Sequence, residues 1–332
     1  MAVAGLLISA LLLWWVLHDV DPREVLGHAR EARWWLFVLS VAVATSVFPI
    51  RAHRWRYLLE RNGKKVGFAP LWHATAIGFM ANNLLPARAG EVARAYAARR
   101  LAGVRFSQAV GSLAVERVMD GLVLLALMAL AITLGGIGQD TAVAGVSLFR
   151  TGVGAALIFV PALGVAFWVV HRPEQSLTLL RRVFARLLPG HLALRAVDVL
   201  EGLLMGLESL RSGSRLLVVT LWSVVHWLVG GLAYWLAFEA FGIEVHWTAA
   251  LLLQSLAAFG VAIPSSPGFF GPFEAVVRAT LGIYGVPASQ AVSYAVAYHL
   301  AAFIPVTLLG FWSLARAHLH LSELRADEAR GE

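Results

Sequence analysis

The stretch that decides the fold of this chain reads Asn82-Asn83-Leu84-Leu85-Pro86-Ala87-Arg88-Ala89-Gly90-Glu91. A second stretch of the same kind reads Pro264-Ser265-Ser266-Pro267-Gly268-Phe269-Phe270-Gly271-Pro272-Phe273-Glu274. Both interrupt long apolar segments, and proline and glycine break helices and expose backbone polar groups. At membrane depth such backbone is tolerated only inside protein or beside water. The two breaks therefore predict a functional site, and matching broken segments in two halves are typical of transporters built from inverted repeats.

The composition around these breaks is that of an integral membrane protein. Of 332 residues, 59% are hydrophobic and 14% are charged, against about 25% charged residues in soluble domains, and the mean hydropathy is +0.73. Several apolar runs reach the roughly 20 residues that cross a bilayer. The chain has no cysteine, which excludes disulfides, thiol catalysis and cysteine metal sites. The net charge of +7 is interpreted as basic cytoplasmic loops facing anionic lipid, rather than as a nucleic-acid surface.

The hydrophobic pattern predicts an all-helical membrane protein with six transmembrane helices and two re-entrant broken-helix hairpins, in one domain at 1–318. The predicted spans are Ala2–Leu17, Trp34–Trp55, Ser107–Leu134, Ser147–Val170, Leu216–Phe241 and Ser289–Leu314, and the predicted hairpins are Leu71–Arg100 and Thr248–Ile283. The segment at 192–211 has apolar residues at helical spacing with charges between them, which predicts a helix on the membrane surface. A charged cytoplasmic tail is expected at 319–332.

The placement of lysine and arginine orients these segments, because cytoplasmic loops carry more of them. Under the predicted topology, 21 of these residues lie on the cytoplasmic side and three on the other side. Both termini are then cytoplasmic, and the expected location is the cell inner (plasma) membrane. The first hairpin enters from the cytoplasm and the second from outside. The units at 34–134 and 216–314 are therefore expected to form an inverted-topology repeat.

A trace of this duplication remains in the sequence. The octet Gly103-Val104-Arg105-Phe106-Ser107-Gln108-Ala109-Val110 shares six of eight residues with Gly285-Val286-Pro287-Ala288-Ser289-Gln290-Ala291-Val292. Each octet follows its broken hairpin at nearly the same spacing. The match supports an internal repeat, and it places Tyr298 and His299 opposite Glu116 and Arg117.

The first hairpin combines Asn82, Asn83, Arg88, Glu91 and Arg94. A new helix is expected to start near Glu91, and its free N–H groups and positive dipole end favour an anion such as a lipid phosphate. Arg88 would add a bidentate phosphate contact. The alternative is a structural pair between Arg88 and Glu91 that holds the hairpin. Glu91 and Arg94 are three residues apart, which allows them to share one helix face.

The second hairpin carries one acid, Glu274, after Gly268 and Gly271, two glycines that permit close backbone approach or a positive φ. A helix start before Glu274 again favours an anion, and the alternative is a packed extracellular loop with a capping glutamate. His299 follows in the next span. It is a candidate for coupling transport to protons, because histidine titrates near neutral pH, and the alternative is a histidine satisfied by hydrogen bonds within the span.

Other ionisable residues fall within or beside the predicted spans. Glu116, Arg117 and Asp120 lie inside a span, where charge is costly and must face protein or water. Arg117 is expected to pair with one or both acids, in a charged cavity wall, in a proton-coupling group, or in an internal clamp to the first hairpin. Arg51 and Arg54 are interpreted as ordinary anchors at the cytoplasmic end of a span, with headgroup binding as the alternative.

These motifs together resemble a known family. In order, N-N-L-L-P-x-R-x-G-E, E-R-x-x-D and P-S-S-P-G-x-x-G-x-F-E resemble the transmembrane region of lysylphosphatidylglycerol synthases and the related stand-alone flippase-like membrane proteins. The resemblance covers roughly residues 1–318 and implies a module that moves lipids between leaflets, aminoacylated phosphatidylglycerol in the synthases. Those synthases carry an aminoacyl-transferase domain after the membrane part, whereas this chain ends at Glu332. No lysyl-lipid synthesis, and no enzyme activity, is therefore expected.

The leading hypothesis is a lipid flippase or scramblase that moves an anionic or aminoacylated phospholipid, or a polyprenyl-linked lipid, along a polar path between the hairpins. The alternatives are a secondary transporter of a small solute or ion, and a non-transporting membrane partner of a lipid- or glycan-modifying enzyme. The expected partners are anionic membrane lipids, with a homo-oligomer or a lipid-modifying enzyme as further candidates; no nucleic acid, cofactor or metal is expected. The candidate residues of the headgroup path are Asn82, Asn83, Pro86, Arg88, Gly90, Glu91, Arg94, Glu116, Arg117, Asp120, Pro264, Ser265, Pro267, Gly268, Gly271, Glu274, Tyr298 and His299.

Overall fold

The computed structural model describes most of the chain. The described residues are 2–60, 65–85, 89–138, 141–143, 145–172, scattered positions between 174 and 190, 213–260 and 266–319. Four candidate site residues lie outside them, namely Pro86, Arg88, Pro264 and Ser265. The predicted surface helix at 192–211 and the predicted tail beyond residue 319 also lie outside the described residues.

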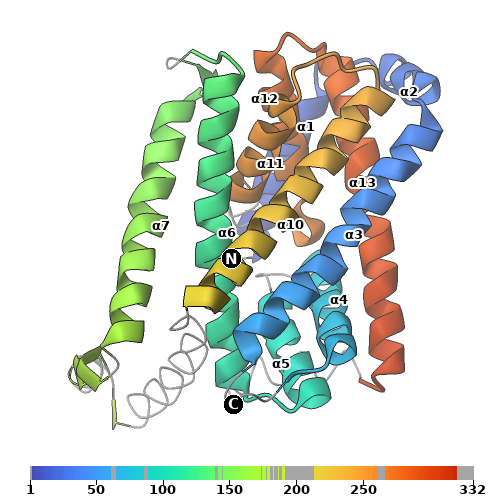
Figure 1. Ribbon diagram of the computed structural model, residues 1–332. Helices are drawn as coiled ribbons and strands as arrows, with labels where there is room; N and C mark the ends of the chain where they lie inside the picture. The colour runs from blue at the N-terminus through green and yellow to red at the C-terminus, as the bar shows by residue number, and fades with distance from the viewer. Residues whose placement is uncertain are drawn as a thin grey trace.

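The described part of the chain is mostly helical, and its two short strands, Ala142–Val143 (β1) and Val146–Ser147 (β2), form an antiparallel ladder (Figure 1). The helices are α1 (Ala2–Leu17), α2 (Pro22–Glu31), α3 (Trp34–Leu59), α4 (Phe68–Leu84), α5 (Gly90–Ala102), α6 (Phe106–Leu134), α7 (Leu148–His171), α10 (Gly213–Ala240), α11 (Thr248–Gly260), α12 (Pro272–Ile283) and α13 (Ala288–Arg316), with a 3₁₀ turn η3 (Pro267–Phe269). Each predicted span and hairpin coincides with one or two of these helices.

Length and composition identify four of these helices as long and apolar enough to cross a membrane: α3, α6, α10 and α13. A fifth candidate combines α1 and α2, which are bent by 80° relative to each other. By itself α1 has 16 residues, about 24 Å at 1.5 Å per residue, which is short of a hydrocarbon core of about 30 Å. The fold is therefore that of a multi-pass membrane protein with four or five candidate spans, and the count of six full spans stays a prediction.

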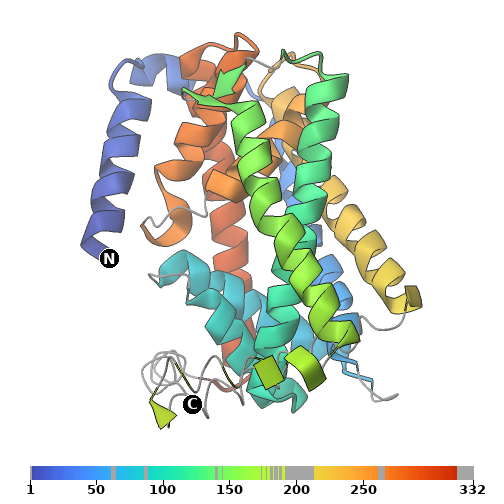
Figure 2. The same cartoon turned by 90° about the vertical axis from the view of Figure 1, so that its left-hand side faces the viewer.

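The two predicted hairpins lie in opposite halves of the molecule. In Figures 1 and 2, α4 and α5 occupy the lower half, while α11 and α12 occupy the upper half. α5, α11 and α12 have 13, 13 and 12 residues, too few to cross a bilayer individually. α3 and α10 pack side by side and run diagonally across the front of the molecule in Figure 1.

Several features of the structure recur at a spacing of 182 residues. Adding 182 to each bound of α6 gives the bounds of α13. Gln108 Nε2 donates to the carbonyl of Leu59 at 3.1 Å, where α3 ends. At the same spacing, Gln290 Nε2 donates to the carbonyl of Phe241 at 3.0 Å, directly after α10. The octet noted in the sequence thus makes the same contact twice.

In each hairpin the two helices cross closely at a glycine, and the two glycines are also 182 residues apart. A Cβ added to Gly78 in α4 would lie 2.6 Å from the Cβ of Arg94 in α5. A Cβ added to Gly260 in α11 would lie 2.7 Å from a methyl group of Val276 in α12. Because a side chain at either glycine would overlap its neighbour, both crossings require glycine. Both residue pairs are again 182 positions apart.

α1 is fastened along α12 by one arginine. Arg278 Nη1 donates to the carbonyls of Trp15 and Val16 at 2.8 and 2.7 Å, and Nη2 contacts Asp19 Oδ2 at 2.6 Å. These contacts satisfy carbonyls that lack partners at a helix C-terminus. The hydrogen bond from Arg278 lowers the pKa of the Asp19 carboxyl, which lies beyond the end of α1.

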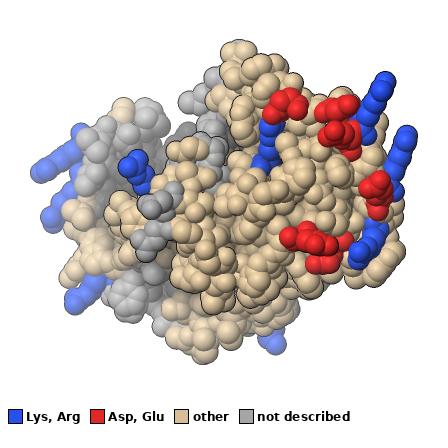
Figure 3. Space-filling model, turned by 90° about the horizontal axis from the view of Figure 1, so that it is seen from above, with Lys and Arg blue, Asp and Glu red and all other residues tan. Residues whose placement is uncertain are grey.

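The outer surface is mainly apolar. Large hydrophobic side chains are exposed along α1, α3, α7, α10 and α13, for example Leu11 and Leu157, as expected for surfaces that face lipid. Seen from above, the acidic side chains gather toward the side on which α2 lies, and much of the remaining face is uncharged (Figure 3). Most of the buried charged side chains in the described part of the chain belong to one cluster on α3, α5 and α6.

Candidate functional site

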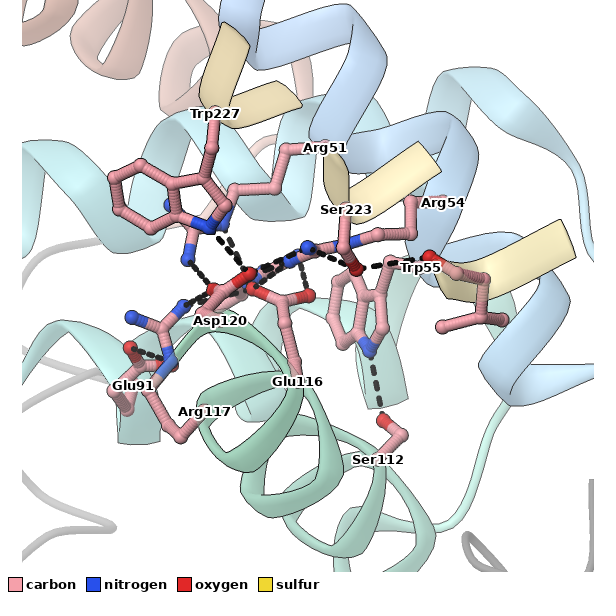
Figure 4. Close-up of polar contacts among 12 residues, drawn as sticks. Arg51, Arg54, Trp55, Glu91, Ser112, Glu116, Arg117, Asp120, Ser223 and Trp227 are labelled. Atoms are coloured by element: carbon pink, nitrogen blue, oxygen red, sulfur yellow. Dashed lines mark hydrogen bonds and ion pairs between the residues drawn. The ribbon is translucent and has the colours of Figure 1, made fainter. Parts of the chain in front are cut away.

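Three helices bring ionised side chains together in the interior. Arg51 and Arg54 are one turn apart on α3, and Glu116 and Asp120 are one turn apart on α6, so each pair shares a helix face. Arg51 Nε lies 2.7 Å from Glu116 Oε1, and Arg51 Nη2 lies 3.1 Å from Asp120 Oδ2. Arg54 Nη1 lies 2.5 Å from Asp120 Oδ1 (Figure 4). These contacts clamp α3 to α6 through two arginines and two carboxylates.

α5 adds a third buried arginine to this cluster. Arg94 Nη1 and Nη2 lie 2.8 and 3.2 Å from the two oxygens of Glu116. The guanidinium of Arg94 stacks 4.0 Å from the centre of the Trp55 ring, a cation–π contact. The indole of Trp55 in turn donates to Ser112 Oγ at 2.7 Å. The first hairpin is therefore joined to α3 and α6 through Arg94.

Arg117 completes the cluster at its accessible edge. Its Nη2 lies 2.8 Å from Glu116 Oε1 and 3.5 Å from Asp120 Oδ2, so it contacts both acids, as the sequence spacing predicts. Its Nε lies 3.6 Å from Glu91 Oε1 (Figure 4). The Arg117 side chain is 44% exposed, whereas the residues Arg54 and Glu116 are fully buried. Arg117 is thus the member of the cluster most open to a ligand.

The seven residues Arg51, Arg54, Glu91, Arg94, Glu116, Arg117 and Asp120 are here called the ionic cluster. Its four guanidinium groups face three carboxylates, which leaves one excess positive charge when Glu91 is ionised. An uncompensated charge away from water is costly. The ionic cluster is therefore suited to receive one anionic group.

A cavity of about 550 Å³, here called the central cavity, borders the ionic cluster. Its lining comes from both hairpins and from the long helices between them: Ala44, Val47, Phe48, Arg51, Phe79, Asn82, Asn83, Glu91, Arg117, His226, Trp227, Gly230, Tyr234, Gln254, Ala257, Ala258, Phe269, Phe273 and Tyr298. Five of the candidate residues from the sequence lie on it, namely Asn82, Asn83, Glu91, Arg117 and Tyr298. The volume is in the range of small-molecule sites, about 300–1,000 Å³.

The two asparagines of the first hairpin make hydrogen bonds to other segments, one within the hairpin and one to α13. Asn82 Oδ1 accepts a hydrogen bond of 3.0 Å from the N–H of Gly90, the first residue of α5. One of the N–H groups expected to receive an anion therefore already has a partner. Asn83 Nδ2 donates to Thr307 Oγ1 on α13 at 2.9 Å. Gly90 has no room for a side chain, because a Cβ would collide with the carbonyl of Gly78 and with Asn82.

The second hairpin is closed by a glutamate and a histidine outside the lining of the central cavity. Glu274 Oε2 accepts from the N–H of Gly271 at 2.7 Å and so caps α12. The other oxygen lies 2.5 Å from His299 Nδ1, and His299 Nε2 lies 2.8 Å from the carbonyl of Gly268. Gly268 and Gly271 have φ values of 74° and 97°, the positive values that glycine permits. Pro267 begins the 3₁₀ turn that contains Gly268.

The interpretation of Arg51 and Arg54 as ordinary membrane anchors is wrong. Their exposed fractions are 5% and 0%, and both bind acids 65 or more positions along the chain. Arg94 is likewise buried, so three of the 21 residues assigned to the cytoplasmic surface lie inside. In sequence, an arginine near the end of a span is interpreted as a membrane anchor unless its binding partner is known. The partners of Arg51 and Arg54 are on α6, far along the chain.

Sequence analysis also missed the contribution of α10. Ser223, His226, Trp227, Gly230 and Tyr234 recur at helical spacing and form one face. Trp227 Nε1 donates to Asp120 Oδ1 at 3.0 Å, and Ser223 Oγ accepts from Arg54 Nη1 at 2.9 Å. The sequence feature that could have identified this face is the series of polar and small residues within an otherwise apolar span. Among the residues that the structure describes, no group of three histidine or acidic side chains is placed to hold a metal ion.

Helices that span a membrane, a buried ionic cluster and a cavity between two broken helical hairpins define an integral membrane protein with an internal polar site. A family model of the lysylphosphatidylglycerol synthase transmembrane region matches residues 2–310. The chain belongs to this family.

The chain is similar to two UPF0104 membrane proteins and to part of a glycosyltransferase. A UPF0104 membrane protein of Methanothermobacter thermautotrophicus is 26% identical over 324 residues, covering 93% of this chain and 90% of that protein. A second UPF0104 membrane protein, of Methanocaldococcus jannaschii, is 22% identical over 69% of this chain and 90% of its own length. Glycosyltransferase AglD of Haloferax volcanii is 34% identical over 167 residues, which cover 48% of this chain and only 26% of that protein.

Proposed function

We propose that this protein is a lipid flippase or scramblase that moves an anionic lipid between leaflets through the central cavity. The observation that carries the proposal is a cavity between two hairpins from opposite halves, bordered by a cluster with one excess positive charge. The headgroup would enter the cavity while the acyl chains remain in lipid. No catalytic step is proposed for the chain itself.

We further propose that α3–α6 and α10–α13 are two copies of one unit with inverted topology. The repeated contacts of Gln108 and Gln290 and the matching bounds of α6 and α13 support this arrangement. The positions of the hairpins in opposite halves also support it (Figure 2). Each hairpin would then enter the bilayer from its own face, and irregular backbone at that depth would be surrounded by protein.

The ionic cluster supports an anionic headgroup. Arg51 and Arg117 belong both to the cluster and to the lining of the central cavity. A lipid phosphate there would balance the excess positive charge and accept hydrogen bonds from guanidinium groups, whose planar geometry suits phosphate. A small anionic solute would satisfy the same two arginines, so a solute transporter remains the competing function for the same site.

The proposed location is the plasma membrane with both termini in the cytoplasm. Removing the three buried arginines from the earlier count leaves an excess of positive residues on the same side, so the proposed orientation is unchanged. A second candidate role, as the membrane partner of a glycan-modifying enzyme, is favoured by the similarity to part of glycosyltransferase AglD. Under that role the purified protein alone would not move lipid.

The deciding experiment reconstitutes the purified protein in vesicles that contain a fluorescent anionic lipid, and follows transfer to the outer leaflet with a membrane-impermeant quencher. We expect transfer by the wild type and a strong loss in Arg117→Gln, which removes the accessible cation. Arg99→Gln is the matched control, since Arg99 is an exposed arginine outside the cavity lining. Equal transfer by both variants and the wild type, or by vesicles without protein, would reject the proposal. Uptake of a small anion in place of lipid would establish the competing function.

A further inference from the structure

We propose that the central cavity selects a phosphodiester headgroup that ends in an uncharged polyol, a sugar or a glycerol, and disfavours headgroups that carry an ammonium group. This inference rests on the proposed function and narrows its substrate. It differs from the aminoacylated lipid that the family resemblance implies. Three observations carry it: the distribution of charge over the lining, the buried polar side chains that α10 and α11 contribute to it, and the net charge of the ionic cluster.

The lining divides into a charged part and an uncharged aromatic part. Its ionised residues, Arg51, Glu91 and Arg117, all come from α3, α5 and α6. The described residues that α10 to α13 contribute include no aspartate, glutamate, lysine or arginine. We call this uncharged part of the lining the aromatic wall. It includes His226, Trp227, Tyr234, Gln254, Phe273 and Tyr298. A headgroup in the cavity therefore meets ionised groups on one part of its surface and rings with neutral polar groups on another.

The aromatic wall offers hydrogen-bonding groups to neutral hydroxyls. His226 is 2% exposed, and its Nδ1 is buried without a hydrogen-bond partner. Buried polar atoms normally have partners, and His226 is a lining residue, so a ligand hydroxyl that packs beside the ring would supply the missing partner. Gln254 is 3% exposed, and its Nε2 donates to the carbonyl of Trp227 at 2.8 Å. Gly230 leaves room for the Gln254 amide oxygen, which a Cβ at residue 230 would strike.

These groups match the chemistry of a polyol. Hydroxyl groups both donate and accept hydrogen bonds, so they can pair with an imidazole or with an amide. The C–H groups of a sugar or glycerol can pack on the faces of Trp227 and Tyr234, since aromatic faces are electron-rich. The aromatic wall would therefore bind the polyol while Arg51 and Arg117 bind the phosphate.

The net charge of the ionic cluster favours a polyol phosphodiester over headgroups that carry an ammonium group. A polyol phosphodiester carries one negative charge, which matches the one excess positive charge. A phosphoethanolamine headgroup is neutral overall and leaves that excess in place, and a lysyl headgroup adds to it. An ammonium group would gain a cation–π contact with the rings, but the described aromatic wall holds no carboxylate, and Glu91 already contacts Arg117.

The first test compares headgroups on lipids with the same acyl chains. Vesicles containing the full-length protein would carry labelled phosphatidylglycerol, phosphatidylinositol, phosphatidylethanolamine or lysyl-phosphatidylglycerol, and a separate arm would carry a hexosyl phosphopolyprenol. We expect the polyol lipids to move about tenfold faster than the two ammonium lipids, as a 1.4 kcal/mol preference gives. Faster movement of the sugar or of the glycerol arm identifies the polyol. Equal or faster movement of the ammonium lipids overturns this inference and leaves the transport function standing, whereas movement of no lipid rejects the transport function.

The second test uses variants in the aromatic wall. Gln254→Leu and His226→Phe should each slow phosphatidylinositol about three- to tenfold, the loss of a typical hydrogen bond. Both should leave phosphatidic acid, which has no polyol, at the wild-type rate. Gln290→Leu is the matched control, because Gln290 makes the same amide contact to a carbonyl at the end of α10 but lies off the lining. If both variants slow the two lipids equally, or leave both at the wild-type rate, the aromatic wall does not recognise a polyol.

Discussion

Replacing Glu116 with glutamine tests whether the ionic cluster holds α3, α5 and α6 together. Glu116 Oε1 lies within 3.3 Å of a nitrogen from each of four arginines: 2.7 Å from Arg51, 3.3 Å from Arg54, 2.8 Å from Arg94 and 2.8 Å from Arg117. Glutamine keeps the size of the side chain but removes its charge, so the excess positive charge of the cluster rises from one to two. Removing one partner of a buried ion pair costs about 3–5 kcal/mol, out of about 5–15 kcal/mol for a whole domain.

The assay is the free energy of unfolding of the purified protein in detergent micelles, measured by denaturant titration. Glu60→Gln is the matched control, because Glu60 forms a partly exposed i,i+4 pair with Arg56 at 3.4 Å, worth about 0.3–0.5 kcal/mol. A double variant, Arg94→Met with Glu116→Gln, should recover part of the loss, since it removes one unpaired charge. A loss for Glu116→Gln no larger than that for Glu60→Gln would refute the claim that buried ion pairs hold this core.

Three further predictions concern the scaffold. Gly90→Ala should lower the free energy of unfolding by about 1–3 kcal/mol, because overpacking destabilises a core. The control Gly154→Ala should not lower it, since a Cβ at that position meets nothing within 4 Å. Equal unfolding free energies for the two variants would contradict the close crossing of α4 and α5. Because Arg278 lowers the pKa of Asp19 below 3.8, the ionised pair stabilises the α1–α12 contact at neutral pH and loses this contribution as the pH falls through the lowered pKa. Crosslinking between cysteines placed on α1 and α12 should therefore weaken in acid for the wild type but not for Asp19→Asn, and the same acid response in both would contradict the assignment. Gln108→Leu and Gln290→Leu should cost similar unfolding free energies, about 0.5–1.5 kcal/mol each, and a large difference would argue against equivalent roles in the two halves.

The sequence was sufficient for features that depend on local chemistry. Apolar runs placed the predicted spans at 107–134 and 289–314 within two residues of the bounds of α6 and α13. The glycines of the second break have the positive φ values that their lack of a Cβ allows. The spacing of Arg117 and Asp120 predicted their contact, because residues three apart meet on a helix.

Features that depend on distant partners were beyond the sequence pattern. Arg51 and Arg54 occur where membrane anchors also occur, and only the approach of α6 shows that they bind Glu116 and Asp120. Glu274 follows a glycine-rich break much as Glu91 does, yet it caps its own helix and contacts His299, while Glu91 lines the central cavity. Helix starts of similar sequence thus differ in role because the surrounding helices present different partners.

If α3–α6 and α10–α13 are two copies of one unit, as we propose, the differences between them explain how such a scaffold would hold one specific site. At the 182-residue spacing, Glu116 corresponds to Tyr298, Arg94 to Val276 and Arg51 to Ala233. The contacts that build the scaffold are kept in both halves, as with Gln108 and Gln290, but the charged residues of the first half are replaced by aromatic and aliphatic ones in the second. Two charged copies would double the excess positive charge and the cost of burying it. One charged and one aromatic copy instead give the central cavity two chemically different sides, which is what recognition of a phosphate joined to a neutral group requires.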